Sequence, residues 1–126
     1  MSLAERRAYK RYKCALPVYL QPADNDAYAL RTVEISMGGL RIECDSLVMR
    51  ALLPDGLKTI PGDRVLMRAR LFLAEQEDPA HLLEVQLHAV GATRLAENCF
   101  AVHFAFVDPT PQQLQLLSEF TEQIGV

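Results

Sequence analysis

The sequence predicts a mainly-β fold: a six-stranded antiparallel β-barrel followed by an amphipathic C-terminal α-helix. Six segments of the 126-residue chain alternate between apolar and polar residues, and clusters of turn-forming residues separate them. Such alternation gives each strand one apolar face, and closing the sheet into a barrel removes its exposed edges. The last segment has apolar residues at helical spacing and begins with residues that cap helices.

The first three expected strands lie within the first 44 residues, at 14–20, 28–35 and 40–44. Pro17 in the first strand indicates an edge position or a bulge, because proline cannot donate a ladder hydrogen bond. The second strand is less regular than the third. Its expected inward face consists of Ala29, Val33 and Ile35, and Arg31 interrupts that face.

The other three expected strands span residues 64–73, 82–95 and 99–106. Between the third and fourth strands, residues 46–63 contain two turn signals, PDG at 54–56 and PGD at 61–63. This connection is long, and it is either a partner-binding insert or an extended turn. The inward residues expected in the last four strands are Leu40, Ile42, Cys44, Val65, Met67, Ala69, Leu71, Leu73, Leu83, Val85, Leu87, Ala89, Phe100, Val102, Phe104 and Phe106.

The chain ends in a segment with a helical pattern, expected over 110–124. Thr110 has the residue type of an N-cap, Pro111 suits the first helical position, and Gln113 completes a capping box. We expect this helix to pack on the barrel through its apolar stripe. The stripe consists of Leu114, Leu117, Phe120 and Ile124, with Thr121 beside Phe120.

The net charge of −3 is unevenly distributed. Residues 1–13 carry five basic side chains and one acidic one, whereas the remaining 113 residues carry eight basic and fifteen acidic side chains. We therefore predict a flexible basic arm over 1–13, followed by one domain over 14–126. The arm can reach an anionic ligand, while the acidic body argues against broad nucleic-acid binding.

Several classes of protein do not fit the sequence. No window approaches the roughly 18 uninterrupted apolar residues of a membrane helix, and the start lacks a charged-then-apolar signal pattern. We expect a cytoplasmic protein with no membrane insertion.

Three widely spaced cysteines lie in apolar runs, where reduced cysteine behaves as a small hydrophobic residue. These are Cys14, Cys44 and Cys99.

Catalytic and metal-binding patterns are also missing from the sequence. The three histidines do not have metal-ligand spacing, and Ser36 does not lie in a nucleophile elbow because Glu34 occupies the place of its first glycine. We therefore expect neither an enzyme nor a metal site nor a cofactor.

The connection between the second and third strands is SMGG, residues 36–39. It lacks the lysine and the following helix of a P-loop. Adjacent glycines leave backbone N–H groups uncovered, so that an anionic or heterocyclic ligand can approach closely. Ser36 adds a hydroxyl at the end of the strand. The alternative interpretation is an ordinary hairpin turn.

The basic arm contains the sequence ERRAYKRYK, residues 5–13. Arg7 and Arg11 are four residues apart, and Tyr9 and Tyr12 are interleaved with the basic residues. Guanidinium groups can chelate phosphates, stack on bases and donate to the O6 and N7 atoms of guanine. The alternative interpretation is a solvated basic tail.

In combination, the arginine pair and the serine-glycine turn resemble the PilZ domain. That family binds the bacterial second messenger cyclic di-GMP through Arg-x-x-x-Arg and (Asp/Asn)-x-Ser-x-x-Gly segments. The first motif matches at Arg7 and Arg11, and the second matches at Ser36 and Gly39 but has Glu34 at its first position. The expected strand order and C-terminal helix are also similar to PilZ, so the resemblance covers nearly the whole chain.

The resemblance implies a cyclic di-GMP receptor that acts as an adaptor. The arm would fold over the ligand on the outer face of the barrel and present a new surface to an unidentified protein partner. Arg7 and Arg11 would engage guanine edges and phosphates, Ser36 would hydrogen-bond the ligand, and Gly39 would leave room for it. The full set of expected ligand-binding residues is Arg6, Arg7, Arg11, Glu34, Ser36, Gly38 and Gly39.

Two alternatives to the receptor function remain. Glu34 places its carboxylate one methylene further out than aspartate would, and losing a hydrogen bond to a charged group costs about 1.5–3 kcal/mol. This departure favours either weakened binding or a degenerate module that binds only protein.

A barrel for single-stranded nucleic acid would need exposed aromatic and basic residues on one strand face. Because Tyr9 and Tyr12 lie in the arm, we do not expect a nucleic-acid partner.

Overall fold

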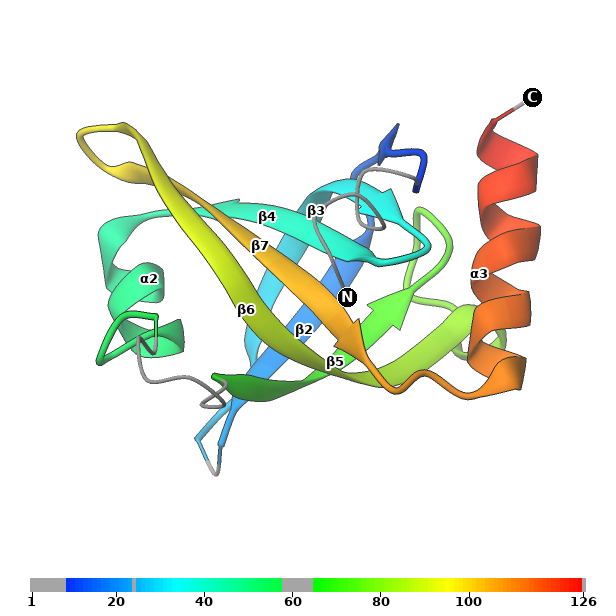
Figure 1. Cartoon of the computed structure of the whole chain (residues 1–126), viewed down its shortest axis with the longest axis horizontal. Helices are drawn as coiled ribbons and strands as arrows, with labels where there is room; N and C mark the ends of the chain where they lie inside the picture. The colour runs from blue at the N-terminus through cyan, green and yellow to red at the C-terminus, as the bar shows by residue number, and fades with distance from the viewer. Residues whose placement is uncertain (1–8, 24, 58–64, 126) are drawn as a thin grey trace.

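The computed structural model of the chain describes residues 9–23, 25–57 and 65–125. Within these residues, six antiparallel strands form a sheet in the order β3-β2-β5-β6-β7-β4, and the pairing of β4 with β3 closes it (Figure 1). The predicted six-stranded barrel is therefore confirmed. Its strands are β2 (Pro17–Pro22), β3 (Tyr28–Ser36), β4 (Gly39–Cys44), β5 (Leu66–Phe72), β6 (Leu82–Ala96) and β7 (Cys99–Val107).

A further short strand, β1 (Tyr12–Lys13), adds to β3, with Tyr12 opposite Ile35. The segment between β1 and β2 is attached to β3 by the buried Thr32 side chain. Its hydroxyl accepts a hydrogen bond from the Leu16 N–H at 2.9 Å and donates one to the Cys14 carbonyl at 2.7 Å. The end of the predicted arm is thus part of the sheet.

The inward face predicted for β3 is partly wrong. Ala29 is exposed and Val33 is half-buried, whereas Thr32 and Ile35 are 1% and 0% exposed. A β-bulge after Thr32 shifts the register against β4, so that inward residues change from even to odd positions. Arg31 therefore lies on the outer face, where its guanidinium donates to the Ala15 carbonyl at 3.1 Å, and it does not interrupt the inward face.

The alternation predicted for the later strands is confirmed in β4, β5 and β6. In β7, Val102 and Phe104 are buried as predicted, but Phe100 and Phe106 are only half-buried, and Ala101 and Ala105 are buried as well. Inward residues of β4, β5, β6 and β7 fill the barrel and include the fully buried Ile42, Leu71, Leu87 and Val102. Pro17 does not mark an edge or a bulge, because β2 pairs regularly with both β3 and β5. It is instead the first residue of its strand, a position that tolerates proline.

The C-terminal helix α3 (Pro111–Ile124) has the predicted start. The Thr110 side chain accepts from the Gln113 N–H, and the Gln113 side chain accepts from the Thr110 N–H, which completes the capping box. Leu117 is fully buried and Phe120 packs against the core, whereas Leu114 and Ile124 are more than a third exposed. The helix therefore packs on the barrel mainly through the middle of its apolar stripe.

A second helix, α2 (Ser46–Leu52), was not predicted from the sequence. Asp45 caps it by accepting a hydrogen bond from the Val48 N–H at 2.9 Å. The turn predicted at 54–56 follows it, with Gly56 at φ +66; the one at 61–63 lies outside the described residues. Figure 1 shows α2 and α3 at opposite ends of the barrel, and a 3₁₀ turn, η1 (Pro79–His81), precedes β6.

None of the helices in the described ranges is long and apolar enough to cross a membrane.

Candidate functional site

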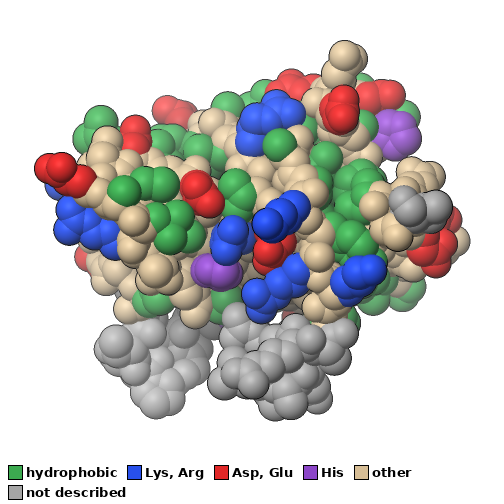
Figure 2. Space-filling model, turned by 90° about the horizontal axis from the view of Figure 1, so that it is seen from above, with side chains coloured by type: hydrophobic (Ala, Val, Ile, Leu, Met, Phe, Trp, Pro, Cys, Tyr) green, Lys and Arg blue, Asp and Glu red, His purple; other side chains and the backbone are tan. Residues whose placement is uncertain are grey.

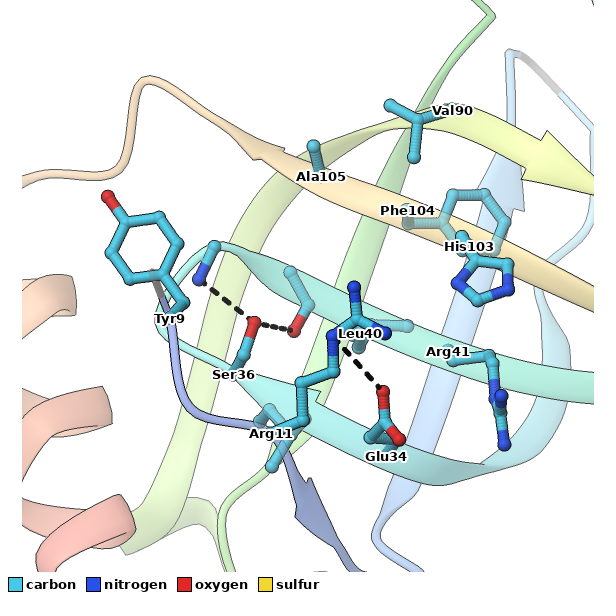
Figure 3. Close-up of a pocket in the computed structure, with 13 residues that line it drawn as sticks. Tyr9, Arg11, Glu34, Ser36, Leu40, Arg41, Val90, His103, Phe104 and Ala105 are labelled. Carbon is cyan, nitrogen blue, oxygen red and sulfur yellow. Dashed lines mark hydrogen bonds and ion pairs between the residues drawn. The ribbon is translucent and has the colours of Figure 1, made fainter. Parts of the chain in front are cut away.

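A shallow depression lies on the outer face of the barrel, between the residues before β1 and the strands β3, β4 and β7 (Figure 3). Its volume is about 60 Å³. Pockets that bury a drug-sized ligand measure about 300–1,000 Å³, so such a ligand would stand largely above this surface. The lining residues are Tyr9, Arg11, Glu34, Ile35, Ser36, Gly38, Gly39, Leu40, Arg41, Val90, His103, Phe104 and Ala105.

The hairpin between β3 and β4 forms one wall of the depression. The Ser36 hydroxyl accepts a hydrogen bond from the Gly38 N–H at 3.1 Å and lies 3.5 Å from the Gly39 carbonyl oxygen. The Gly38 carbonyl in turn accepts from the Phe106 N–H at 3.0 Å. The hairpin is therefore closed by the serine and attached to β7.

Each of the two glycines of this hairpin has a close neighbour. A Cβ on Gly39 would lie 1.9 Å from the carbonyl oxygen of Phe104, so this position admits only glycine beside β7. A Cβ on Gly38 would lie 2.9 Å from Cδ2 of Tyr9, whose ring covers that residue. The packing of β4 against β7 thus accounts for Gly39 without any ligand.

Charged side chains meet beside the hairpin. Nε of Arg11 lies 3.8 Å from Oε1 of Glu34, and the two side chains are 56% and 17% exposed. In Figure 3 the Arg11 side chain extends from the N-terminal segment over β3, toward Glu34. A single contact at this distance is a weak ion pair, so Arg11 is held only loosely.

Arg41 and His103 line the depression but were not predicted from the sequence. Arg41 on β4 stands directly opposite Glu34 on β3, and His103 on β7 stands opposite Arg41. The Arg41 Nε atom is buried and has no hydrogen-bond partner among the described residues. Arg41 lies between the inward residues Leu40 and Ile42, so alternation puts it on the outer face, but only the register between the strands shows which residues it faces.

The depression brings together five of the residues predicted to bind ligand. These are Arg11, Glu34, Ser36, Gly38 and Gly39. Two others, Arg6 and Arg7, lie outside the described residues. Figure 2 shows one face of the molecule, on which basic side chains gather near the middle, around an acidic side chain and beside a histidine.

The cysteines do not contribute reactive groups to this site. All three are free, and none lines the depression. Burial, with smaller contributions from Asp45 and Cys99, raises the pKa of the Cys44 thiol to about 11. Cys44 is therefore protonated at neutral pH. Among the described residues, no group of His, Cys, Asp or Glu side chains is arranged to hold a metal ion.

A second depression, of about 370 Å³, lies on the outer face of β2, β5 and β6. Two of its polar residues, Tyr19 and Arg70, are in contact. The guanidinium carbon of Arg70 lies 4.9 Å from the centre of the Tyr19 ring, and the Tyr19 hydroxyl donates to Glu77. The lining residues are Tyr19, Gln21, Ala27, Arg68, Ala69, Arg70, Glu84 and Val85.

Comparison with known proteins gives a family and a fold. The family model described as the PilZ domain matches residues 5–123. No curated protein sequence matches the chain. Among solved structures, the PilZ domain of Escherichia coli YcgR, determined with c-di-GMP, has a TM-score of 0.65 at 14% identity. That match covers 95% of this chain and 92% of the other.

Two longer proteins also match. The Klebsiella pneumoniae MrkH–c-di-GMP complex has a TM-score of 0.68 at 15% identity, covering 94% of this chain and 52% of the other. The Bacillus subtilis inhibitor of motility MotI/DgrA has a TM-score of 0.63 at 18% identity, covering 94% and 50%. This chain therefore spans about half the length of these two proteins, and at such identities the likeness concerns the fold.

Proposed function

The chain belongs to the PilZ domain family, and from this membership we propose that it is a receptor for cyclic di-GMP that acts as a non-enzymatic adaptor. The observation that carries the proposal is the position of Arg11, Ser36 and Gly39 in one depression on the outer barrel face. These three residues match the family's two binding motifs, and they come from separate segments of the chain. The YcgR and MrkH structures, both solved with c-di-GMP, support the choice of ligand.

Arg11 has the properties that the ligand requires. Its side chain is more than half exposed and makes only a long contact with Glu34. A guanidinium can bind phosphate through two parallel hydrogen bonds and can also donate to a guanine edge. In the proposed complex Arg11 turns from Glu34 to the dinucleotide, and Arg7 adds a second guanidinium from the preceding segment.

The shallowness of the depression suggests how binding becomes a signal. A cyclic dinucleotide is much larger than a hollow of about 60 Å³, so the hairpin alone can cover only one side of it. Residues of the basic arm then cover the other side. A ligand that binds the covered arrangement better shifts the protein toward it, and the new surface becomes available to a protein partner.

The first test is isothermal titration calorimetry with cyclic di-GMP, using cyclic di-AMP and GTP as control ligands. We expect selective binding in the micromolar range or tighter. Arg11→Ala should weaken it at least about a hundredfold, because two charge-assisted hydrogen bonds are lost. Arg70→Ala, in the second depression, is the matched control and should bind as the unaltered protein does.

Each other outcome has a definite meaning. Absence of binding by the unaltered protein at high ligand concentration would refute the receptor function. Unchanged affinity of Arg11→Ala would make residues 1–13 an ordinary basic tail. An equal loss in Arg11→Ala and Arg70→Ala would indicate attraction by overall charge rather than a site.

A further inference from the structure

Glu34 occupies the position at which the family's motif has aspartate or asparagine, and its surroundings suggest a use for the longer side chain. Its carboxylate is 17% exposed and lies 3.8 Å from Arg11. If Arg11 turns to a dinucleotide, Glu34 is left partly buried beside two phosphate charges. A carboxylate in that position is unfavourable unless another cation replaces Arg11.

Arg41 is placed to be that cation. It stands directly opposite Glu34 in the pairing of β3 with β4, and side chains that face each other in this way have Cβ atoms about 4.5–5.5 Å apart. Figure 3 shows Glu34 between Arg11 on one side and Arg41 on the other. The Arg41 Nε is buried and lacks a hydrogen-bond partner in the described part of the chain.

We propose that Glu34 exchanges partners on ligand binding: it leaves Arg11 and pairs with Arg41, which makes Arg41 a positioning residue of the site. This inference rests on the proposed receptor function. The extra methylene of glutamate lets the carboxylate reach across to the neighbouring strand, and the exchange satisfies a buried donor at the moment when Arg11 is released. The departure from the motif is then compensated within the β3–β4 pair.

The exchange predicts that the effects of Arg41 and Glu34 on cyclic di-GMP affinity are coupled. Arg41→Met keeps the side-chain stem but removes the charge, and we expect it to weaken cyclic di-GMP binding about tenfold in the calorimeter. In a Glu34→Gln background the same change should have no further effect, because no carboxylate remains to be neutralised. Arg41→Lys, which retains charge but lacks Nε, should recover only part of the affinity.

The second depression offers a matched control. Arg70 stands opposite Glu84 across β5 and β6, the same outer-face arrangement of an arginine and a glutamate. Arg70→Met should leave the affinity for cyclic di-GMP unchanged. Melting temperatures of all variants without ligand show whether any loss of affinity comes from unfolding.

A ligand-free measurement tests the exchange directly. In Arg11→Ala, Glu34 loses its first partner and should pair with Arg41 without any nucleotide. The Nε–Hε signal of Arg41 in a ¹H–¹⁵N spectrum should then shift downfield relative to the unaltered protein. The shift should disappear in Arg11→Ala/Glu34→Gln. Its absence in Arg11→Ala itself would overturn the exchange.

The two proposals fail in distinguishable ways. If the unaltered protein binds cyclic di-GMP and Arg41→Met binds equally well, the exchange is wrong and the receptor function stands. If the unaltered protein does not bind, the receptor function is wrong, and the spectra of Arg11→Ala alone decide whether Glu34 can change partners. Equal effects of Arg41→Met with and without Glu34→Gln would mean that Arg41 acts independently of Glu34.

Discussion

The outer face of the barrel carries two depressions built from the same kinds of side chain: a tyrosine, arginines and a carboxylate. The one on β2, β5 and β6 has the larger volume, about 370 Å³ against about 60 Å³. In it, the guanidinium of Arg70 lies over the Tyr19 ring, and the Tyr19 hydroxyl donates to Glu77.

The smaller depression, on β3, β4 and β7, is incompletely paired. Its ion pair between Arg11 and Glu34 is long, and the Nε atom of Arg41 has no partner in the described ranges. A ligand gains most where it supplies hydrogen bonds that the protein lacks, because a buried polar group without a partner is costly. A buried donor without a partner therefore distinguishes the smaller depression, although the other has the larger volume.

The largest effect is expected when the hairpin that borders only the smaller depression is disturbed. Gly39→Ala would place a Cβ 1.9 Å from the Phe104 carbonyl oxygen, so β4 and β7 would have to separate. We expect a loss of about 3 kcal/mol or more in the free energy of unfolding, measured by urea denaturation.

Gly91→Ala in β6 is the control for this change, because a Cβ there meets nothing within 4 Å. It should alter the free energy of unfolding by no more than about 1 kcal/mol. If Gly39→Ala were as stable as Gly91→Ala, β4 and β7 could not approach each other as closely as described. The smaller depression would then lack the fixed wall described above.

A smaller effect is expected from Ser36→Ala. The Ser36 hydroxyl accepts from the Gly38 N–H, which is partly buried under Tyr9, so the change leaves that donor without its partner. We expect a loss of about 1 kcal/mol in the free energy of unfolding and faster hydrogen exchange at Gly38. Ser118→Ala in α3, whose hydroxyl makes no hydrogen bond within the described residues, should be neutral or slightly stabilising.

The sequence predicted the barrel well because most of its strands obey simple alternation. The inward residues of β5, such as Met67 and Leu71, follow the period of two without interruption. In β3 the same rule failed, since the bulge after Thr32 changes which side faces inward. No single residue type indicates where such a bulge occurs, so alternation alone predicts the wrong face for Ala29 and Val33.

The short helix α2 and the residue Arg41 were missed for different reasons. Seven residues are too few to show a helical period, and only the N-cap Asp45 signals where α2 begins. For the candidate site, motif spacing identified Arg11 and Ser36 without a structure. Arg41 belongs to no such motif, and its position opposite Glu34 depends on a register that the bulge has shifted.

The smallest effect is predicted for Tyr19→Phe, in the larger depression. The hydroxyl that it removes donates to Glu77 at the surface, where water replaces either partner readily. We expect an unchanged melting temperature and an unchanged affinity for cyclic di-GMP.

The hydrogen bond to Glu77 stabilises the protonated phenol and raises the pKa of Tyr19. Glu77→Gln should therefore lower the pKa of Tyr19 in an ultraviolet titration.

Tyr19→Phe also tests whether the larger depression takes part in ligand binding. A drop in affinity for cyclic di-GMP on Tyr19→Phe would mean that ligand reaches β2 and β5, and that volume had been the better guide. Unchanged affinity, together with a large loss in Arg11→Ala, would locate binding at the smaller depression. There the ion pair between Arg11 and Glu34 is long, and the Nε atom of Arg41 is buried without a hydrogen-bond partner among the described residues.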